Sequence, residues 1–374
     1  MFEKETNLGG ASASFACFCL LKNRRFYLEG FIMQKIPVQN AIGQALCHDM
    51  TAILESGFKG IKFKRGHVIT EADIPELLNI GKTHVYVWKP EADEVHEDDA
   101  AAELVKVLCG ANLEYTGPAE GKFQISSATD GLFCVNSEAL RHINSVDDYT
   151  VATRPGFCAV AKGEKLCGMR IVPLVTKRSN VDAAVKLAAE NFPVLEVKSY
   201  KIKRVGAIIT GSEIFTGKIK DAFEPILHKK VEYYGAKLER VTMCDDDLNM
   251  IKSAIFAYVD AGIELILLTG GMSVDPDDLT PTAIRQSGAA VVTQGVPMQP
   301  GNMLTIAKLG SVTLIGVPGA SMHSPVTSLD VFLPRIMAGV EIKKSDIAKC
   351  GEGGFCMGCK ICTYPLCYFG NIGH

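Results

Sequence analysis

The sequence has no excess of basic residues and no long apolar run, and each absence excludes a class of function. Its 374 residues contain 39 Lys and Arg against 42 Asp and Glu, which gives a formal net charge of −3. Without a positive field the chain lacks the electrostatic signature of a protein that binds nucleic acid or an anionic membrane. No apolar run reaches the roughly 18 residues that a membrane-spanning helix requires. We therefore expect the partners to be small molecules or other proteins.

The sequence also lacks the evenly spread cysteines of a small disulfide-rich secreted protein. Most of its 13 cysteines are scattered among apolar neighbours. This setting is typical of small buried residues with unreactive thiols. The others crowd the carboxyl terminus. This distribution favours a reducing, cytoplasmic location.

Changes of pattern divide the chain into five segments, and its length exceeds that of a typical single domain. Residues 1–32 contain an apolar stretch whose flanking charges are wrong for a signal peptide, so we predict a disordered or non-native extension. The remaining predicted segments are a small α+β unit (33–90), a middle α+β region (91–202), an α/β domain (203–343) and a Cys-rich tail (344–374).

From residue 203 onward, short apolar runs alternate with amphipathic segments. This alternation predicts an α/β fold, in which a doubly wound, mostly parallel sheet carries helices on both faces and is preceded by a smaller α+β region. The expected strands are 205–209, 238–243, 263–268, 290–293 and 311–315, and the expected helices are 221–234, 248–261 and a long helix from 321 to 338.

Three of these strands end in glycine-containing loops, namely Thr210-Gly211, Thr269-Gly270-Gly271 and Pro318-Gly319. In a parallel sheet the three exits lie on one edge, where ligands of such sheets bind. Each loop leads to a helix, and the amino terminus of a helix presents unpaired N–H groups to an anion. The sequence therefore predicts an anion-binding pocket at this edge.

Acidic side chains crowd the loop after the strand at 263–268, where Asp275, Asp277 and Asp278 follow the paired glycines. Carboxylates repel a phosphate unless a cation lies between them, and Mg²⁺ is usually held by one or two carboxylates together with substrate phosphates. The loop thus indicates Mg²⁺-dependent phosphate chemistry. The alternative is that Thr280 only caps a helix with Pro281 at its first position, beside solvated turn aspartates.

The segment from 203 to about 340 resembles the molybdopterin-binding domain shared by MogA-type adenylyltransferases and MoeA-type molybdenum insertases. Residues 41–49 and 65–87 resemble, more weakly, segments that flank the insertase core. The motifs that carry the resemblance are Thr210-Gly211-Ser212-Glu213, Gly217 with Asp221, Gly235, Asp245-Asp246, Thr269-Gly270-Gly271, Asp278, Pro300-Gly301 and Val317-Pro318-Gly319.

The resemblance implies a role in molybdenum cofactor biosynthesis, with molybdopterin or adenylylated molybdopterin as substrate and molybdate as the inserted oxyanion. It implies catalytic roles for Asp278, Asp221 and Glu213, with Mg²⁺ held by the two aspartates. It also implies a homodimer and a molybdoenzyme client. The residues implied to bind the pterin substrate are Thr210, Gly211, Ser212, Thr269, Gly270, Gly271, Ser273, Pro300, Gly301, Pro318 and Gly319.

Three functions remain open. A molybdopterin molybdenumtransferase, which inserts molybdate and releases AMP, is favoured by the additional amino-terminal region. A molybdopterin adenylyltransferase is favoured by the Asp-x-Thr-Pro pattern at 278–281. A non-catalytic carrier is favoured by departures from the insertase pattern at 221–223 and 317–321, and by the absence of a Ser-Ala-Met-Asp-Gly-Tyr-Ala motif.

The carboxyl-terminal tail contains a Cys-x₂-Cys-x₂-Cys-x₄-Cys sequence, formed by Cys356, Cys359, Cys362 and Cys367 and called the tail motif below. Disulfides between such close neighbours would be strained, whereas thiolates two residues apart are common in zinc and iron–sulfur sites. The spacing predicts a zinc or iron–sulfur site and leaves the choice of metal open. The alternative is a disordered tail of free thiols.

Overall fold

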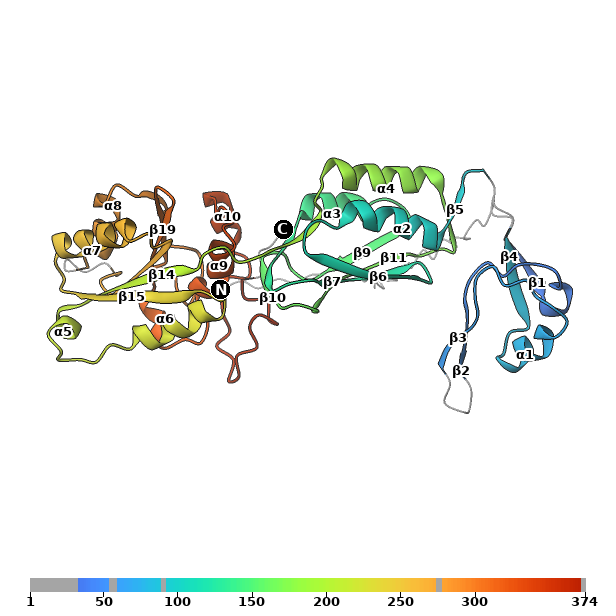
Figure 1. The fold of residues 1–374 in the computed structure, drawn as a ribbon, viewed down its shortest axis with the longest axis horizontal. Coiled ribbons are helices and arrows are strands. Elements are labelled where there is room, and N and C mark those ends of the chain that lie inside the picture. Colours follow the sequence, from blue (N-terminus) through green and yellow to red (C-terminus); the bar gives the residue numbers. More distant parts are fainter. Residues whose placement is uncertain (1–32, 54–58, 89–91, 274–277, 371–374) are drawn as a thin grey trace, which may run out of the picture. The chain divides into compact units, whose positions relative to one another are not determined.

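The computed structural model describes residues 33–53, 59–88, 92–273 and 278–370, and the chain divides into two compact units, Met1–Glu91 and Ala92–His374 (Figure 1). The predicted extension 1–32 lies outside the described residues. Among the helices of the described ranges, none has the length and apolar character needed to cross a membrane.

The first unit is a small α+β fold. Its core is built from apolar side chains such as Val38, Leu46, Phe63 and Leu77. Its elements are β1 (Met33–Pro37), which pairs antiparallel with β4 (His84–Trp88), β2 (Met50–Ile53), which pairs antiparallel with β3 (Lys59–Phe63), the short η1 (Val38–Asn40) and α1 (Asp73–Asn79).

The second unit begins with a region of antiparallel sheets against which two helices, α2 (Glu97–Leu108) and α4 (Arg178–Glu190), are packed. Its core combines residues of both helices with strand residues such as Phe123 and Phe133. The other elements are β5 (Glu94–His96), β6 (Leu113–Ala119), β7 (Lys122–Ser127), β8 (Gly131–Val135), α3 (Ser137–Ile143), β9 (Tyr149–Thr153), β10 (Cys158–Val160), β11 (Lys165–Ile171), β12 (Val175–Lys177) and β13 (Leu195–Lys198).

The rest of the second unit is an α/β domain with a six-stranded sheet in the order β15-β14-β16-β19-β18-β17. The first four strands are parallel and the last two pair antiparallel, so the predicted doubly wound, mostly parallel sheet is confirmed. The strands are β14 (Arg204–Thr210), β15 (Lys237–Cys244), β16 (Leu265–Thr269), β17 (Ala290–Gln294), β18 (Thr305–Leu309) and β19 (Val312–Gly316).

Alternate residues of the central strands pack into two separate hydrophobic cores, one on each face of the sheet. Ala207 and Ile209 pack with α6 (Phe223–Glu232) and α9 (Ser328–Met337), whereas Ile208 packs with α7 (Leu248–Asp260) and α8 (Thr280–Gln286). Figure 1 shows α6 on one side of β14 and β15, with α7 and α8 on the other. Because successive side chains of a strand point to opposite faces, a strand covered on both sides is buried throughout, as β16 is.

The predicted long helix to Ala338 is confirmed at its carboxyl-terminal end, but its predicted start is wrong. The chain forms a short 3₁₀ helix, η2 (Gly319–Met322), and starts again at α9. The break arises because Thr327 and Asp330 form a capping box, in which the Asp330 carboxylate accepts the Thr327 N–H at 2.8 Å. Strand β18 was absent from the prediction.

The Cys-rich tail begins with α10 (Lys344–Lys349) and packs against the α/β domain. The Gln299 N–H donates to the Gly354 carbonyl at 2.8 Å, and the Cys356 N–H donates to the Gln299 carbonyl at the same distance. Cys350 and Phe369 are buried in the core that α6 and α9 share. The tail thus shares the core of the α/β domain instead of forming its own.

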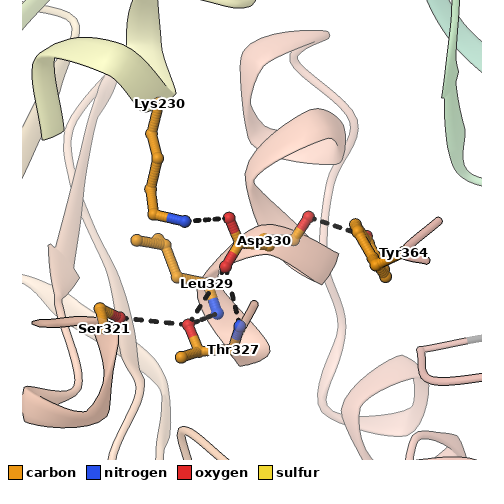
Figure 2. A network of polar contacts seen from close by, with 6 residues as sticks. All are labelled: Lys230, Ser321, Thr327, Leu329, Asp330 and Tyr364. Carbon is orange, nitrogen blue, oxygen red and sulfur yellow. Dashed lines mark hydrogen bonds and ion pairs between the residues drawn. The ribbon is translucent and has the colours of Figure 1, made fainter. Parts of the chain in front are cut away.

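One polar network connects the start of α9 to three neighbouring segments (Figure 2). Asp330 forms an ion pair with Lys230 of α6, and its carbonyl accepts the Tyr364 hydroxyl of the tail at 3.1 Å. The Thr327 hydroxyl lies 3.1 Å from that of Ser321 in η2. These contacts fix the positions of η2, α6 and the tail relative to the start of α9.

Candidate functional site

A cavity of about 570 Å³ opens at the carboxyl edge of the sheet. Strands β14, β15 and β16 run parallel, so their exits meet at this edge, as predicted. The cavity is lined by Thr210, Gly211, Glu213 and Ile214 after β14, by Ile219, Lys220, Ala222 and Phe223 before and at the start of α6, by Asp246, Gly270, Gly271 and Asp278, and by Met322 of η2.

The exits of β14 and β16 approach each other closely at Gly270. Its φ is +81°, and a Cβ at this position would lie 2.1 Å from the Thr210 carbonyl oxygen. Only glycine fits such an approach, since other residues would both clash and occupy the left-handed region at a cost. The hydroxyl oxygens of Thr210 and Thr280 lie 3.2 Å apart beside it. The geometry of the site therefore depends on the close contact between the ends of β14 and β16.

Three carboxylates line the cavity, from Glu213, Asp246 and Asp278, together with one cationic side chain, Lys220. This lining brings together Glu213 and Asp278, which the sequence predicted as catalytic. An excess of negative charge makes the cavity unfavourable for a bare phosphate and favourable for a phosphate accompanied by a cation.

Asp246 was not among the predicted site residues. Its carboxylate accepts the Ser212 N–H at 2.9 Å, and the Ser212 hydroxyl also donates to Asp245. Ser212 itself does not line the cavity among the described residues. The sequence did contain a signal for the contact between Asp246 and Ser212. Asp245 and Asp246 follow β15, whose exit lies at the same edge as the glycine loops.

Asp221 caps α6 in the structure, and its predicted role as a Mg²⁺ ligand stays a prediction. Its two carboxylate oxygens accept the N–H groups of Phe223 at 2.9 Å and Glu224 at 2.7 Å. These contacts cap the first turn of α6. Its neighbours Lys220 and Ala222 line the cavity, but among the described residues Asp221 does not. Each carboxylate oxygen of Asp221 accepts one N–H and keeps a second lone pair, so these hydrogen bonds do not prevent it from binding a cation.

The other predicted glycine segments, Pro300-Gly301 and Pro318-Gly319, are not part of the described lining of the cavity but contact the elements next to it. Gly301, with φ of +105°, packs on the first residue of α9, where the Ser328 N–H donates to the Pro300 carbonyl at 3.2 Å. Pro318 and Gly319 begin η2, which contributes Met322 to the lining. Their predicted contact with substrate stays a prediction.

The two remaining predicted residues lie on either side of the paired glycines. Thr269 ends β16 and is fully buried, and its hydroxyl has no hydrogen-bond partner among the described residues. Ser273 is exposed. Asp275 and Asp277 lie outside the described residues.

The residues present fit Mg²⁺ only together with a phosphate ligand. Within the described ranges no group of three or more His, Cys, Asp or Glu side chains is arranged to hold a metal ion. Asp278 and Asp246 nevertheless line one cavity, and one or two carboxylates complemented by substrate phosphates are the usual Mg²⁺ ligands.

The tail motif does not fit a four-thiolate metal site in the conformation described. Cys359 and Cys362 are exposed, whereas Cys356 and Cys367 pack against the core of the α/β domain. A zinc or iron–sulfur site would need the exposed pair to move toward the other two. The metal at the tail motif stays a prediction.

Comparison with known proteins identifies two family matches. Residues 206–338 match the model described as a probable molybdopterin binding domain, which confirms the resemblance for this domain. Residues 35–89 match a domain of unknown function.

The chain is similar to known proteins over part of its length. It is 23% identical over 176 residues to a molybdopterin molybdenumtransferase of Synechococcus elongatus, covering 44% of each chain. It is 35% identical over 77 residues to a CinA-like protein of Mycobacterium leprae, covering 21% of this chain and 18% of that protein. A molybdopterin biosynthesis enzyme MoaB from Thermus thermophilus aligns with 37% of this chain and 98% of its own, at 21% identity and a TM-score of 0.31.

Proposed function

Since residues 206–338 belong to the molybdopterin-binding domain family, we propose that the chain acts in molybdenum cofactor biosynthesis, by inserting molybdate into adenylylated molybdopterin with release of AMP. The observation that carries this proposal is the cavity at the sheet edge, where Asp278, Glu213 and the paired glycines meet. The similarity to a molybdenumtransferase over 176 residues supports the insertion step.

In this reaction water attacks the adenylyl phosphorus and the phosphoanhydride bond breaks, so that AMP leaves and molybdopterin retains its own phosphate. The two dithiolene thiols of molybdopterin form two bonds to the molybdenum of molybdate, and one molybdate oxygen leaves as water with the two thiol protons. Such transfers depend on positioning and charge neutralisation more than on covalent catalysis. Gly270 and Gly271 leave room for the phosphates to approach the backbone, and Lys220 offers a positive charge. Asp278 would hold Mg²⁺, which when bound neutralises charge on the phosphates.

Asp246 has a positioning role in this proposal. It anchors the amino terminus of α5 (Ser212–Phe215) through the Ser212 N–H, and α5 presents Glu213 to the cavity. This contact links the exit of β15 to that of β14. Glu213 would orient the attacking water or a second ligand of the cation.

Activity measurements with two substrate pairs distinguish the three functions. One reaction contains molybdopterin and MgATP, and the other contains adenylylated molybdopterin, Mg²⁺ and molybdate. AMP release in the second reaction alone identifies an insertase, and adenylylation in the first identifies an adenylyltransferase. Binding of both pterins without turnover identifies a carrier. Adenylyltransferase activity is the second candidate function. The Asp-x-Thr-Pro pattern at 278–281 favours it, and Thr280 of that pattern is buried beside Thr210.

The variant Asp278→Ala tests the catalytic role directly. We expect turnover to fall by a factor of about 10² to 10³, as when one electrostatic stabiliser of a transition state is removed. Asp247→Ala is the matched control, because Asp247 caps α7 by accepting the Met250 N–H at 2.7 Å and is not part of the lining described. It should lose about 1 kcal/mol of stability and keep its turnover. Equal rates for Asp278→Ala and wild type at saturating Mg²⁺ would refute the assignment.

Assembly and location are parts of the same proposal. We expect a cytoplasmic homodimer that delivers its product to a molybdoenzyme client. Sedimentation of the full chain measures the first property, and a monomer at assay concentrations would contradict it.

A further inference from the structure

A second cavity, of about 420 Å³, lies in the second unit between α9, the loop 154–158 and the tail segment 364–370. It shares no described lining residue with the cavity at the sheet edge. Its charged lining residues are Arg154 and Arg335, and its described lining contains no Asp or Glu. The charge character of this cavity is therefore opposite to that of the proposed active site.

Arg335 of α9 has donors that the fold leaves unused. The residue is only 2% exposed. Its Nη2 donates to Asp346 Oδ2 at 2.9 Å and to the Glu341 carbonyl at 3.4 Å, but Nε and Nη1 have no partner among the described residues. Buried N–H groups are rarely left unpaired, because each retains the cost of its desolvation. The unpaired donors of a buried guanidinium indicate a ligand that accepts them.

The residue that supports this guanidinium is itself strained. The Arg335 guanidinium carbon lies 4.1 Å from the centre of the Phe157 ring, which is a cation–π contact. Phe157 has φ of +62° although it is not glycine, and its N–H donates to the Phe133 carbonyl at 2.7 Å. Non-glycine residues in the left-handed region are concentrated at ligand sites, where surrounding contacts maintain the strain.

The size and walls of the cavity define the class of ligand. About 420 Å³ is the volume of roughly fourteen water molecules at 30 Å³ each, much more than an inorganic oxyanion fills. Besides Phe157, the walls include the rings of Tyr364 and Tyr368. Aromatic walls with few polar groups are typical of sites for small organic ligands.

We propose that this cavity binds a small organic anion whose phosphate or carboxylate accepts hydrogen bonds from Arg335 and Arg154, and whose aromatic body packs against Phe157 and the tail tyrosines. Arg154 lines the cavity, and its side chain is 27% exposed. Its ion pair with Glu164, a residue outside the lining described, uses Nη1, and the described residues show no other hydrogen bond of its guanidinium. Nε and Nη1 of Arg335 are closed to solvent. Binding therefore requires the side chains that cover these two atoms to move.

Titration of the full-length chain with three probes tests the proposal. Phenyl phosphate carries both the charge and the ring, inorganic phosphate carries only the charge, and phenol carries only the ring. Phenyl phosphate should bind at least about tenfold more tightly than either of the others. Its binding should also slow amide hydrogen exchange in segment 364–370.

Two variants assign the binding to this cavity. Arg335→Lys and Arg154→Gln should each weaken phenyl phosphate binding by about tenfold or more, because each removes charge-assisted hydrogen bonds. Arg240→Lys, at an exposed position of β15, should leave it unchanged. If Arg335→Lys does not fold, the partly exposed Arg154 decides the outcome. Unaltered affinity in Arg154→Gln, no binding by wild type, or equal affinity for phosphate and phenyl phosphate would each overturn the proposal.

Discussion

Replacing Gly270 by alanine should be far more damaging than replacing Gly217, although both glycines have similar backbone conformations. Their φ angles are +81° and +74°, so in either position an L-residue enters the left-handed region, which costs about 1–2 kcal/mol. At Gly217 nothing lies within 4 Å of the added Cβ. The expected loss of stability for Gly217→Ala is therefore about 1–2 kcal/mol.

At Gly270 the added Cβ would lie 2.1 Å from the Thr210 carbonyl oxygen and 2.6 Å from its hydroxyl. Thr210 is held in register with Cys244 of β15, so it has little freedom to move away. Such overpacking costs about 1–3 kcal/mol beyond the conformational penalty. We expect a total of about 2–5 kcal/mol for Gly270→Ala, and a loss of turnover, because the exits of β14 and β16 must separate.

Urea denaturation followed by circular dichroism measures both variants. Tryptophan fluorescence is unsuitable, because the single tryptophan, Trp88, belongs to β4 of the first unit. Hydrogen exchange in β14 and β16 then shows whether the loss is local to the site. If the two variants are destabilised equally, within about 0.5 kcal/mol, the close contact at Gly270 does not hold the strand exits together.

Two further predictions concern other parts of the chain. Burial, with a further effect from the neighbouring Asp98, raises the pKa of Glu97 from 4.5 to about 7, so the stability that its protonated form contributes is present below pH 4.5 and is lost as the pH rises through about 7. The urea midpoint of wild type should therefore fall more between pH 5 and 8 than that of Glu97→Gln, and parallel profiles would contradict this. The tail motif should bind about one equivalent of zinc or one iron–sulfur cluster after anaerobic purification, and metal-free protein with titratable tail thiols would count against it.

The sequence was most informative where structure depends on local pattern. The apolar run predicted as a strand at 263–268 forms β16 (Leu265–Thr269), and the predicted helix at 248–261 forms α7 (Leu248–Asp260). Both signals are periodicities of side chains within one element. The parallel arrangement followed from the alternation of such elements, and with it the edge on which the glycine loops meet.

The failures have a shared cause, since each depends on contacts that a local pattern does not contain. An aspartate at the start of a helix is compatible with both a metal ligand and a cap, and the cap that Asp221 forms was not predicted from the sequence. Asp246 lines the cavity because β15 lies beside β14. The capping box at Thr327 restarts a helix that periodicity alone would continue from 321 to 338.

The two cavities of the second unit handle negative charge in opposite ways. At the sheet edge, the described lining has three carboxylates and one cationic side chain, Lys220, so a phosphate is held there when a cation offsets the acidic lining. Beside α9, the described lining has two arginines, each paired with a carboxylate outside that lining, so an anion there would accept hydrogen bonds from arginine and would need no metal. We therefore expect anion binding to depend on Mg²⁺ at the first site and to be independent of it at the second. This difference allows the two sites to be titrated separately in one protein.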